Sequence, residues 1–252
     1  IAGQSAVLLK NDAILPLDKE ERIAVIGKFA KRPRYQGTGS SIINPLKKDD
    51  ICRMLDETGA NYIYAPGYNT RSEEIDQKLI DEAKKIASEC DKVVVTAGLT
   101  DLYESEGFDR KHLKLPESHN ELMREIVSVN TNTVVVLMNG APVEMPWVND
   151  VKGILEAYLG GQAGGGAVVD ILFGDVNPSG KIAETFPLKL KDTPCYNYFP
   201  GSTKTVEYRE SIYVGYRYYD KVDKKVLFPF GFGLSYTTFE YSNMTIEKLG
   251  DY

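Results

Sequence analysis

The stretch Lys92-Val93-Val94-Val95-Thr96-Ala97 decides the fold class. After its lysine it is short, uncharged and rich in β-branched residues, which is typical of a strand buried on both faces of a parallel sheet. Two other stretches have the same character, Ile23-Ala24-Val25-Ile26-Gly27 and Thr133-Val134-Val135-Val136-Leu137-Met138. The sequence therefore predicts a sheet with parallel strands in its interior.

Segments of helical character separate these strands. Helices are predicted at 49–58, from Ser72, from Pro116 and at 162–173, and additional strands at 61–65, 153–158 and 181–186. This alternation predicts an α/β fold in which a mostly parallel sheet is sandwiched by helices. In such sheets the residues that contact ligands lie on loops beyond the carboxyl ends of the strands. Chemistry is therefore expected just after Gly27, Ala97, Met138 and Leu159.

The last quarter of the chain has a different composition. Residues 196–241 hold nine of the 16 tyrosines and five of the nine phenylalanines, without helical periodicity. We expect an extended connector that wraps an existing surface and buries its aromatic rings there. From Thr238 a partial alternation predicts a β-strand, and one strand is not a domain. The predicted organisation is an α/β domain at 1–190, an aromatic-rich connector at 191–236 and the start of another unit at 237–252.

Composition and charge exclude several classes of protein. The chain has 252 residues, enough to bury a sizeable core without disulfides, and its net charge of −6 comes without a basic block. Such a chain is a poor binder of nucleic acids and of anionic membranes. It has no apolar run near the roughly 20 residues that span a bilayer. No basic segment precedes the apolar residues at its start, so we expect no secretion signal there.

The three cysteines, Cys52, Cys90 and Cys195, are widely spaced. No pair has the spacing of metal ligands, so we expect reduced thiols and no metal site. Reduced thiols fit a reducing compartment, and a cytoplasmic location is the expectation, with an extracellular location as the alternative for the parent protein.

Two glycine-rich stretches follow predicted strands. The stretch Tyr35-Gln36-Gly37-Thr38-Gly39-Ser40-Ser41 offers amides and hydroxyls to a polar ligand, but a flexible surface turn explains it equally well. The stretch from Gly160 to Gly166 is followed by no Gly-Lys-Ser/Thr, so a nucleotide site is disfavoured. We expect a closely packed helix start there, because glycine lets two backbones approach.

The loop after the strand at 92–97 concentrates charge. It contains Asp101, Glu104, Glu106, Asp109 and Arg110, a set suited to general acid/base chemistry. Shielding of a glutamate by a neighbouring Tyr or Phe would favour its protonated form, as a general acid requires. Composition alone favours a solvated acidic loop, and Asp109 with Arg110 has the alternative of forming an internal ion pair.

Histidine chemistry is disfavoured. His112 and His119 are not near a Gly-x-Ser-x-Gly sequence, so a Ser-His-Asp hydrolase is not expected. Both are predicted to be solvated or to cap a helix.

Taken in order, seven stretches resemble the carboxyl-terminal α/β sandwich domain of glycoside hydrolase family 3, the β-glucosidase and β-xylosidase family. They extend over nearly the whole chain, so the resemblance is specific. They are Ser5–Asn11 with Leu15–Leu17, Ile23–Gly27, Gly37–Ser41 with Asn44-Pro45, Glu106–Arg110 with Leu115-Pro116, Asn139–Val143, Gly174–Lys181 and Phe228–Thr237.

The resemblance implies an (α/β)6 sandwich and a retaining glycosidase that works through two carboxylates. Family members carry an aspartate nucleophile on a separate (β/α)8 barrel domain, and the sandwich supplies the acid/base glutamate. Glu106 occupies the matching position here, with Glu104 as its competitor two residues away. Ser40 matches a position that helps to bind the sugar at the cleavage point, and Ser41 is a weaker match. No cofactor is implied.

The resemblance also implies that half of the active site lies elsewhere. A barrel needs about 250 residues of its own, and no nucleophile motif is found in this chain. We therefore expect the acid/base-bearing domain of an exo-acting β-glucosidase-like enzyme for terminal β-D-glucosyl residues, inactive when isolated. Its expected partners are a β-glucoside or oligosaccharide and the barrel of the parent chain, and residues 237–252 would begin a fibronectin type III-like domain. The alternative is a non-catalytic carbohydrate-binding module.

Overall fold

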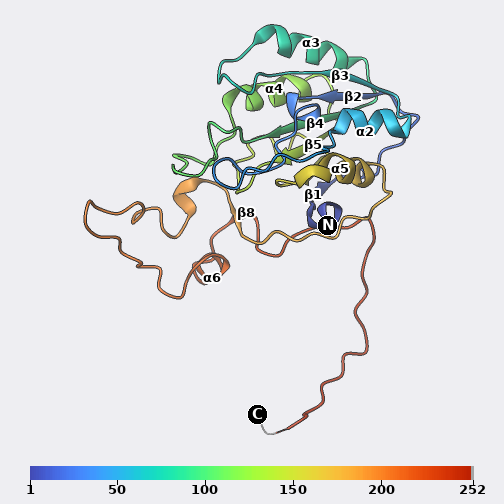
Figure 1. The fold of residues 1–252 in the computed structure, drawn as a ribbon. Coiled ribbons are helices and arrows are strands. Elements are labelled where there is room, and N and C mark those ends of the chain that lie inside the picture. Colours follow the sequence, from blue (N-terminus) through green and yellow to red (C-terminus); the bar gives the residue numbers. More distant parts are fainter. Residues whose placement is uncertain (251–252) are drawn as a thin grey trace.

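A six-stranded sheet forms the centre of the molecule, in the order β1-β6-β5-β4-β2-β3 (Figure 1). The computed structural model describes residues 1–250. All neighbouring strands run parallel except β1, which pairs with β6 in the antiparallel direction. The prediction of a mostly parallel sheet is confirmed. The strands are β1 (Val7–Asn11), β2 (Ile23–Ile26), β3 (Tyr62–Ala65), β4 (Lys92–Gly98), β5 (Thr133–Met138) and β6 (Gly153–Glu156).

The predicted strand at 181–186 is wrong. The outer edge of β6 is already taken by β1, so no place is left there for a further strand. Instead Ile182 exchanges backbone hydrogen bonds of 2.9 Å with the loop that contains Gly231 and Phe232. Only the short strands β7 (Phe186–Pro187) and β8 (Val226–Phe228) form here, as a separate antiparallel pair.

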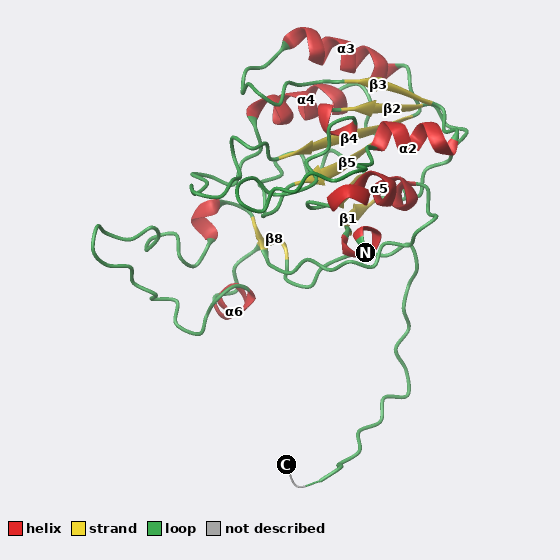
Figure 2. Cartoon of the chain, viewed as in Figure 1, coloured by secondary structure: helices red, strands yellow, loops and turns green. Residues whose placement is uncertain are grey.

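Two helical layers flank the sheet, as Figure 2 shows for the helices drawn in red. Helix α3 (Gln77–Ser88) contacts α4 (Glu117–Val127), whereas α2 (Ile51–Thr58) contacts α5 (Gly164–Leu172). The helix predicted from Ser72 begins later, because Asp76 caps it by accepting a hydrogen bond from the Leu79 amide. The shorter helices are α1 (Ala2–Ser5) and α6 (Tyr216–Lys221), with 3-10 turns at Lys28–Ala30, Gly161–Ala163 and Leu190–Asp192.

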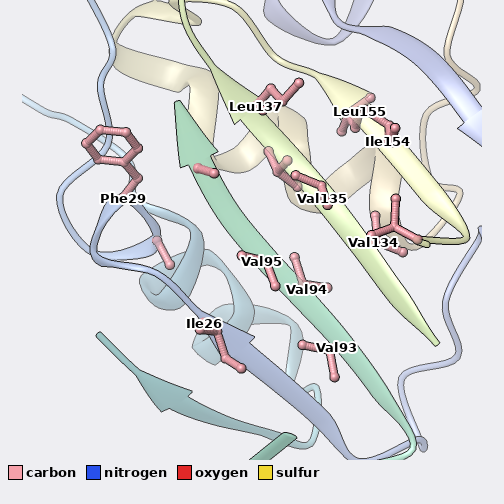
Figure 3. Close-up of a cluster of buried hydrophobic side chains, with 14 of the residues drawn as sticks. Ile26, Phe29, Val93, Val94, Val95, Val134, Val135, Leu137, Ile154 and Leu155 are labelled. Carbon is pink, nitrogen blue, oxygen red and sulfur yellow. The ribbon is translucent and has the colours of Figure 1, made fainter. Parts of the chain in front are cut away.

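Strands β4 and β5 are buried on both faces, which confirms the prediction from their composition. Successive side chains of a strand point to opposite faces, so a run of valines fills the core on both sides of the sheet. Figure 3 shows Val93, Val94 and Val95 of β4 beside Val134 and Val135 of β5. Each is 0–1 % exposed. Burial of one such side chain contributes about 1.5–3 kcal/mol.

The aromatic connector meets its prediction only in part. Residues Phe228, Phe232, Leu234 and Tyr236 pack against the core as expected. Residues 195–214, which we call the aromatic arm, instead project from the body as the orange loop in Figure 1. Tyr208 of this arm is 80 % exposed. The rings are exposed because the described part of the chain offers them no apolar surface.

The strand predicted from Thr238 is also wrong. Residues 238–250 follow an extended course without pairing and run away from the domain (Figure 1). A strand needs a neighbour for its backbone groups, and none of the described strands lies beside this segment. The division into units at residues 190 and 236 stays a prediction.

Among residues 1–250, no helix combines the length and the apolar character needed to cross a bilayer. The same residues contain no group of three His, Cys, Asp or Glu side chains placed to hold a metal ion.

Candidate active site

The order of strands creates a topological switch point at the carboxyl ends of β2 and β4. After β2 the chain proceeds to β3 on one side, and β4 then pairs with the other side of β2. The helices that follow these two strands, α2 and α4, belong to opposite layers. Ligands bind at such a switch point in open α/β sheets. The two polar stretches singled out in the sequence, 35–41 and 101–110, lie on the two loops that leave this point.

Glu106 and Ser40 meet where these two loops come together. One carboxylate oxygen of Glu106 accepts hydrogen bonds from the Ser40 amide and from the Ser40 hydroxyl, both at 2.6 Å. The Glu106 amide donates to the Thr38 carbonyl at 3.1 Å. Gly39, which lies between Thr38 and Ser40 in the sequence, has φ 110°. A Cβ at this position would lie 2.5 Å from the Glu106 Cβ. Only glycine allows the two loops to approach this closely.

Ser41 does not take part in this contact. Its side chain is exposed, and no hydrogen bond among the described residues joins it to Glu106. The structure therefore brings Ser40, but not Ser41, to the candidate acid.

The surroundings of Glu106 favour its charged form over the protonated form that a general acid requires. The side chain is exposed, and the hydroxyl and amide of Ser40 lower the pKa of its carboxyl group. Neither neighbouring ring shields it, since Phe108 is 50 % exposed and Tyr103 packs against the core and His112. The condition for favouring the protonated acid, shielding by Tyr103 or Phe108, is therefore not met in the described structure. Glu106 is an ionised carboxylate here, because hydrogen bonds to the charged form favour it.

Glu104 faces a different loop. Its carboxylate accepts a hydrogen bond of 2.9 Å from the amide of Gly140, in the loop after β5. Its carbonyl accepts one of 2.8 Å from the guanidinium of Arg34. Glu104 is thus tied to neighbours on both sides, whereas the Glu106 carboxylate projects beside Ser40. This geometry favours Glu106 over its competitor as the reacting group.

Comparisons with known proteins agree with this picture. Residues 6–236 match the family described as the glycosyl hydrolase family 3 C-terminal domain. The chain belongs to glycoside hydrolase family 3. It is 57 % identical to thermostable β-glucosidase B of Acetivibrio thermocellus over 98 % of this chain and 33 % of that protein. It is 45 % identical to an exo-α-(1→6)-L-arabinopyranosidase of Bifidobacterium breve over 99 % of this chain and 34 % of that protein.

Solved structures show the same fold. A family 3 β-glucosidase of Bifidobacterium adolescentis superposes with a TM-score of 0.91 at 48 % identity, over 94 % of this chain and 35 % of that one. A β-glucosidase of Kluyveromyces marxianus in complex with glucose superposes with a TM-score of 0.88 at 26 % identity, over 95 % of this chain and 48 % of that one. The α/β sandwich is therefore shown for this family 3 chain. The chain spans about a third of the length of the curated relatives it matches.

The sequence contained no signal for Arg34, which joins the two loops of this candidate site. It is 7 % exposed, and its guanidinium contacts both Asp101 and the Glu104 carbonyl. Arginine between Pro33 and Tyr35 has no pattern that predicts burial. Its position depends on how the loops after β2 and β4 fold together.

The alternative ion pair of Asp109 with Arg110 is not formed among the described residues. Arg110 instead donates to the Pro142 carbonyl at 3.0 Å. Burial lowers the pKa of its guanidinium, while Glu104 acts in the opposite direction. Arg110 therefore anchors the far end of the acidic loop to the loop after β5.

His119 corrects a prediction, since it neither faces solvent nor caps a helix. It is 1 % exposed on α4, its ring centroid lies 3.8 Å from that of Tyr68, and its Nδ1 accepts a hydrogen bond from the Gly98 amide. Burial lowers its pKa to about 3. His112 is exposed, as predicted. Neither contacts Glu106 in the described structure.

Another buried titratable group, Glu156, ends β6. It accepts hydrogen bonds from the Asn139 side chain at 3.0 Å and from the Tyr158 amide at 2.9 Å. Burial raises its pKa to about 8. Through these two hydrogen bonds, Glu156 links the loop after β5 to the loop after β6. A charged residue at the end of an apolar strand was the one available signal, and it did not distinguish this role from solvation.

The glycine-rich stretch is a packing feature, as predicted. A Cβ on Gly165 would lie 2.8 Å from the carbonyl carbon of Asp50, which precedes α2. Glycine at this place lets α5 approach the start of α2.

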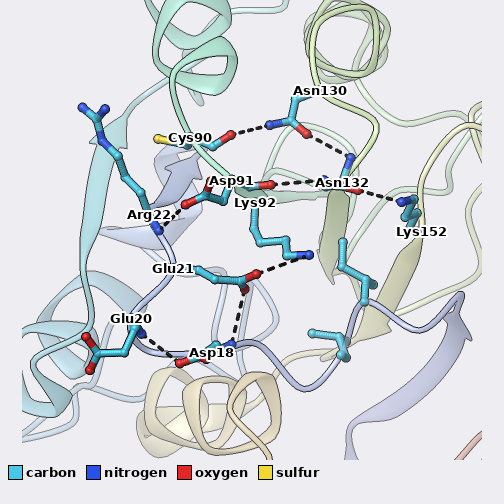
Figure 4. Close-up of polar contacts among 12 residues, drawn as sticks. Asp18, Glu20, Glu21, Arg22, Cys90, Asp91, Lys92, Asn130, Asn132 and Lys152 are labelled. Carbon is cyan, nitrogen blue, oxygen red and sulfur yellow. Dashed lines mark hydrogen bonds and ion pairs between the residues drawn. The ribbon is translucent and has the colours of Figure 1, made fainter.

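The opposite edge of the sheet is also polar, but its groups satisfy each other. Figure 4 shows Arg22, Asp91, Asn132 and Lys152 linked around the amino ends of the strands. The Asp91 carboxylate accepts from the Arg22 amide at 2.9 Å, and Lys152 donates to Asn132 at 2.7 Å. These contacts link the amino ends of neighbouring strands, so they have a structural role.

Proposed function

We propose that Glu106 is the acid/base residue of a retaining, exo-acting β-glucosidase-like enzyme, and that this chain is the half of the active site that supplies it. The observation that carries the proposal is the exposed Glu106 carboxylate held by Ser40 at the switch point of the sheet. Membership of glycoside hydrolase family 3 and relatives named as β-glucosidases support it.

The chemistry needs two carboxylates. In the first step Glu106, as an acid, gives its proton to the glycosidic oxygen while a nucleophile attacks the anomeric carbon. In the second step Glu106, as a base, takes a proton from the water that releases the sugar. The nucleophile would be an aspartate of a (β/α)8 barrel in the parent protein, about 5–5.5 Å from Glu106.

Because the pKa of the Glu106 carboxyl group is lowered, the barrel and the substrate must raise it before the first step. Ser40 now stabilises the charged carboxylate, whereas the first step needs the protonated acid. We propose that a bound sugar takes over the hydroxyl and amide of Ser40. Closure by the barrel then removes water, and desolvation raises the pKa of the carboxyl group. Ser40 would thus bind the sugar and release the acid in one event.

The test uses the complete parent enzyme with Glu106→Gln and Glu106→Ala. Glucosides with poor leaving groups should lose about 10²–10⁴-fold in kcat/KM, because general acid catalysis contributes that much. Dinitrophenyl glucosides should be spared in the first step, and azide should rescue the second step of Glu106→Ala. Glu104→Gln is the matched control and should show no dependence on the leaving group. Unchanged turnover of disaccharides by Glu106→Gln would refute the proposal.

The isolated chain distinguishes this function from a carbohydrate-binding module. With half of the contacts absent, it should neither hydrolyse aryl β-glucosides and aryl α-L-arabinopyranosides nor bind glucose detectably in calorimetry. Clear saturable binding of glucose or of an oligosaccharide by the isolated chain would favour the module instead.

A further inference from the structure

A buried guanidinium connects the two loops of the candidate site. Arg34 belongs to the loop after β2, the loop that carries Ser40. Its side chain crosses to the loop after β4, where one nitrogen donates to the Glu104 carbonyl at 2.8 Å and the other forms an ion pair with Asp101. Only 6 % of the side chain is exposed, so little of it is accessible to a ligand.

The contact with Asp101 continues around the site. The Asp101 carboxylate also accepts a hydrogen bond from the Thr38 hydroxyl at 2.9 Å. The Thr38 carbonyl in turn accepts from the Glu106 amide at 3.1 Å. Arg34 is therefore bonded to residues that lie two and five positions before Glu106 and, through Thr38, to its backbone.

We propose that Arg34 is a positioning residue, which sets the distance between Ser40 and Glu106 by fixing the two loops to each other. The inference rests on the proposed acid/base role of Glu106. It adds that the acid is positioned by a group that does not itself contact the sugar.

The chemistry of the side chain supports positioning over stability. A guanidinium is planar and presents adjacent donors in a fixed geometry, so it holds two acceptors at a set angle. It is also costly to bury, and its Nε has no hydrogen-bond partner among the described residues. Its ion-pair partner Asp101 is 70 % exposed, and ion pairs that reach solvent contribute little to stability.

A loop that carries the acid tolerates little displacement. A shift of about 1 Å in a reacting group costs about 10²-fold in rate. Arg34→Lys keeps the positive charge but not the two-pronged geometry, so it tests positioning and not charge. It should reduce kcat/KM of the complete enzyme about 10- to 100-fold for poor leaving groups and far less for dinitrophenyl glycosides.

The decisive experiment is a double-mutant cycle in the complete parent enzyme. If Arg34 acts through Glu106, Arg34→Lys should cost almost nothing once Glu106→Gln is present. Arg53→Lys is the matched control, since Arg53 is paired with Asp49 beside α2, away from the site. It should show no dependence on the leaving group and should combine additively with Glu106→Gln.

Each outcome has a distinct meaning. A Glu106→Gln enzyme without dependence on the leaving group refutes the proposed function itself. A normal Glu106→Gln phenotype with an additive or leaving-group-independent Arg34→Lys effect overturns the positioning role alone. Should Arg34→Lys fail to fold, Asp101→Asn removes the same ion pair from its exposed partner, and the same cycle applies to it.

Discussion

Strand β4 and the aromatic arm are both rich in large apolar side chains, yet they have opposite environments. Val93 and Val95 are fully buried between β2 and β5, whereas Tyr208 and Ile212 of the arm are exposed. The difference does not follow from the presence of apolar side chains, which both regions contain. It follows from the presence of a surface to cover, because apolar side chains are buried only against other apolar groups.

The segment just after the arm supports this reading. It has the same aromatic composition, but the Leu234 amide donates to the Leu8 carbonyl of β1 at 2.8 Å. Phe228 and Phe232 then stack near each other against the core, with ring centroids 5.3 Å apart. Burial of these two rings thus accompanies a backbone hydrogen bond to β1. In the described structure, no residue of the arm makes such a bond to a strand. The arm therefore presents surface that the described chain leaves uncovered.

The largest expected effect comes from a matched pair of phenylalanines. Phe186 is fully buried and Phe199 of the arm is 55 % exposed. Phe186→Ala should lower the free energy of unfolding by about 3–5 kcal/mol, as deletions of buried rings do. Phe199→Ala should change it by less than about 0.5 kcal/mol. Urea unfolding of the chain measures both, and equal losses would break the comparison between core and arm.

The next effect concerns pH and the buried His119. Burial lowers its pKa to about 3 in the folded chain, whereas an unfolded histidine titrates near about 6.5. The unfolded state therefore binds more protons between these values, and the stability that is fully present above about pH 6.5 falls as the pH decreases. His119 should contribute a loss of about 1.4 kcal/mol per pH unit between pH 6 and 4.

His119→Gln should remove that part of the slope, as measured by urea unfolding at several pH values. The control is His112→Gln, because His112 is exposed and should leave the slope unchanged. Glu156 acts with the opposite sign, since its pKa is raised to about 8, so only the difference between the variant and the unsubstituted chain is compared. An identical slope in both would show that His119 is accessible to protons.

The smallest effect tests how the end of the connector is anchored. The Tyr236 hydroxyl donates to the Ile171 carbonyl of α5 at 2.8 Å. Tyr236→Phe keeps the ring and removes this bond, so unfolding should become easier by about 0.5–1.5 kcal/mol. Tyr208→Phe in the arm is the control and should have no measurable effect in the same urea titration. A loss in the free energy of unfolding below the error of the measurement would show that this hydrogen bond does not anchor the connector.

Much of the fold could be predicted because its signals are local. Valine runs indicated β4 and β5, and the order of motifs indicated the family and the position of Glu106. Two features could not be predicted, the edge strand β1 and the absence of a strand over most of 181–186. Both depend on which segment of the chain pairs with the edge of β6. For the same reason the exposure of the aromatic arm had no signal in its composition.

The candidate site divides in the same way. By itself the sequence determined that polar loops follow β2 and β4, and it predicted Glu106 as the acid/base residue. Only the tertiary structure decided that Ser40 holds the carboxylate in its ionised form, that Arg34 joins the two loops and that His119 is buried. Secondary structure follows from periodicity within a few residues, whereas the contacts of Ser40 and Arg34 join residues about 65–70 positions apart, which only the folded sheet brings together.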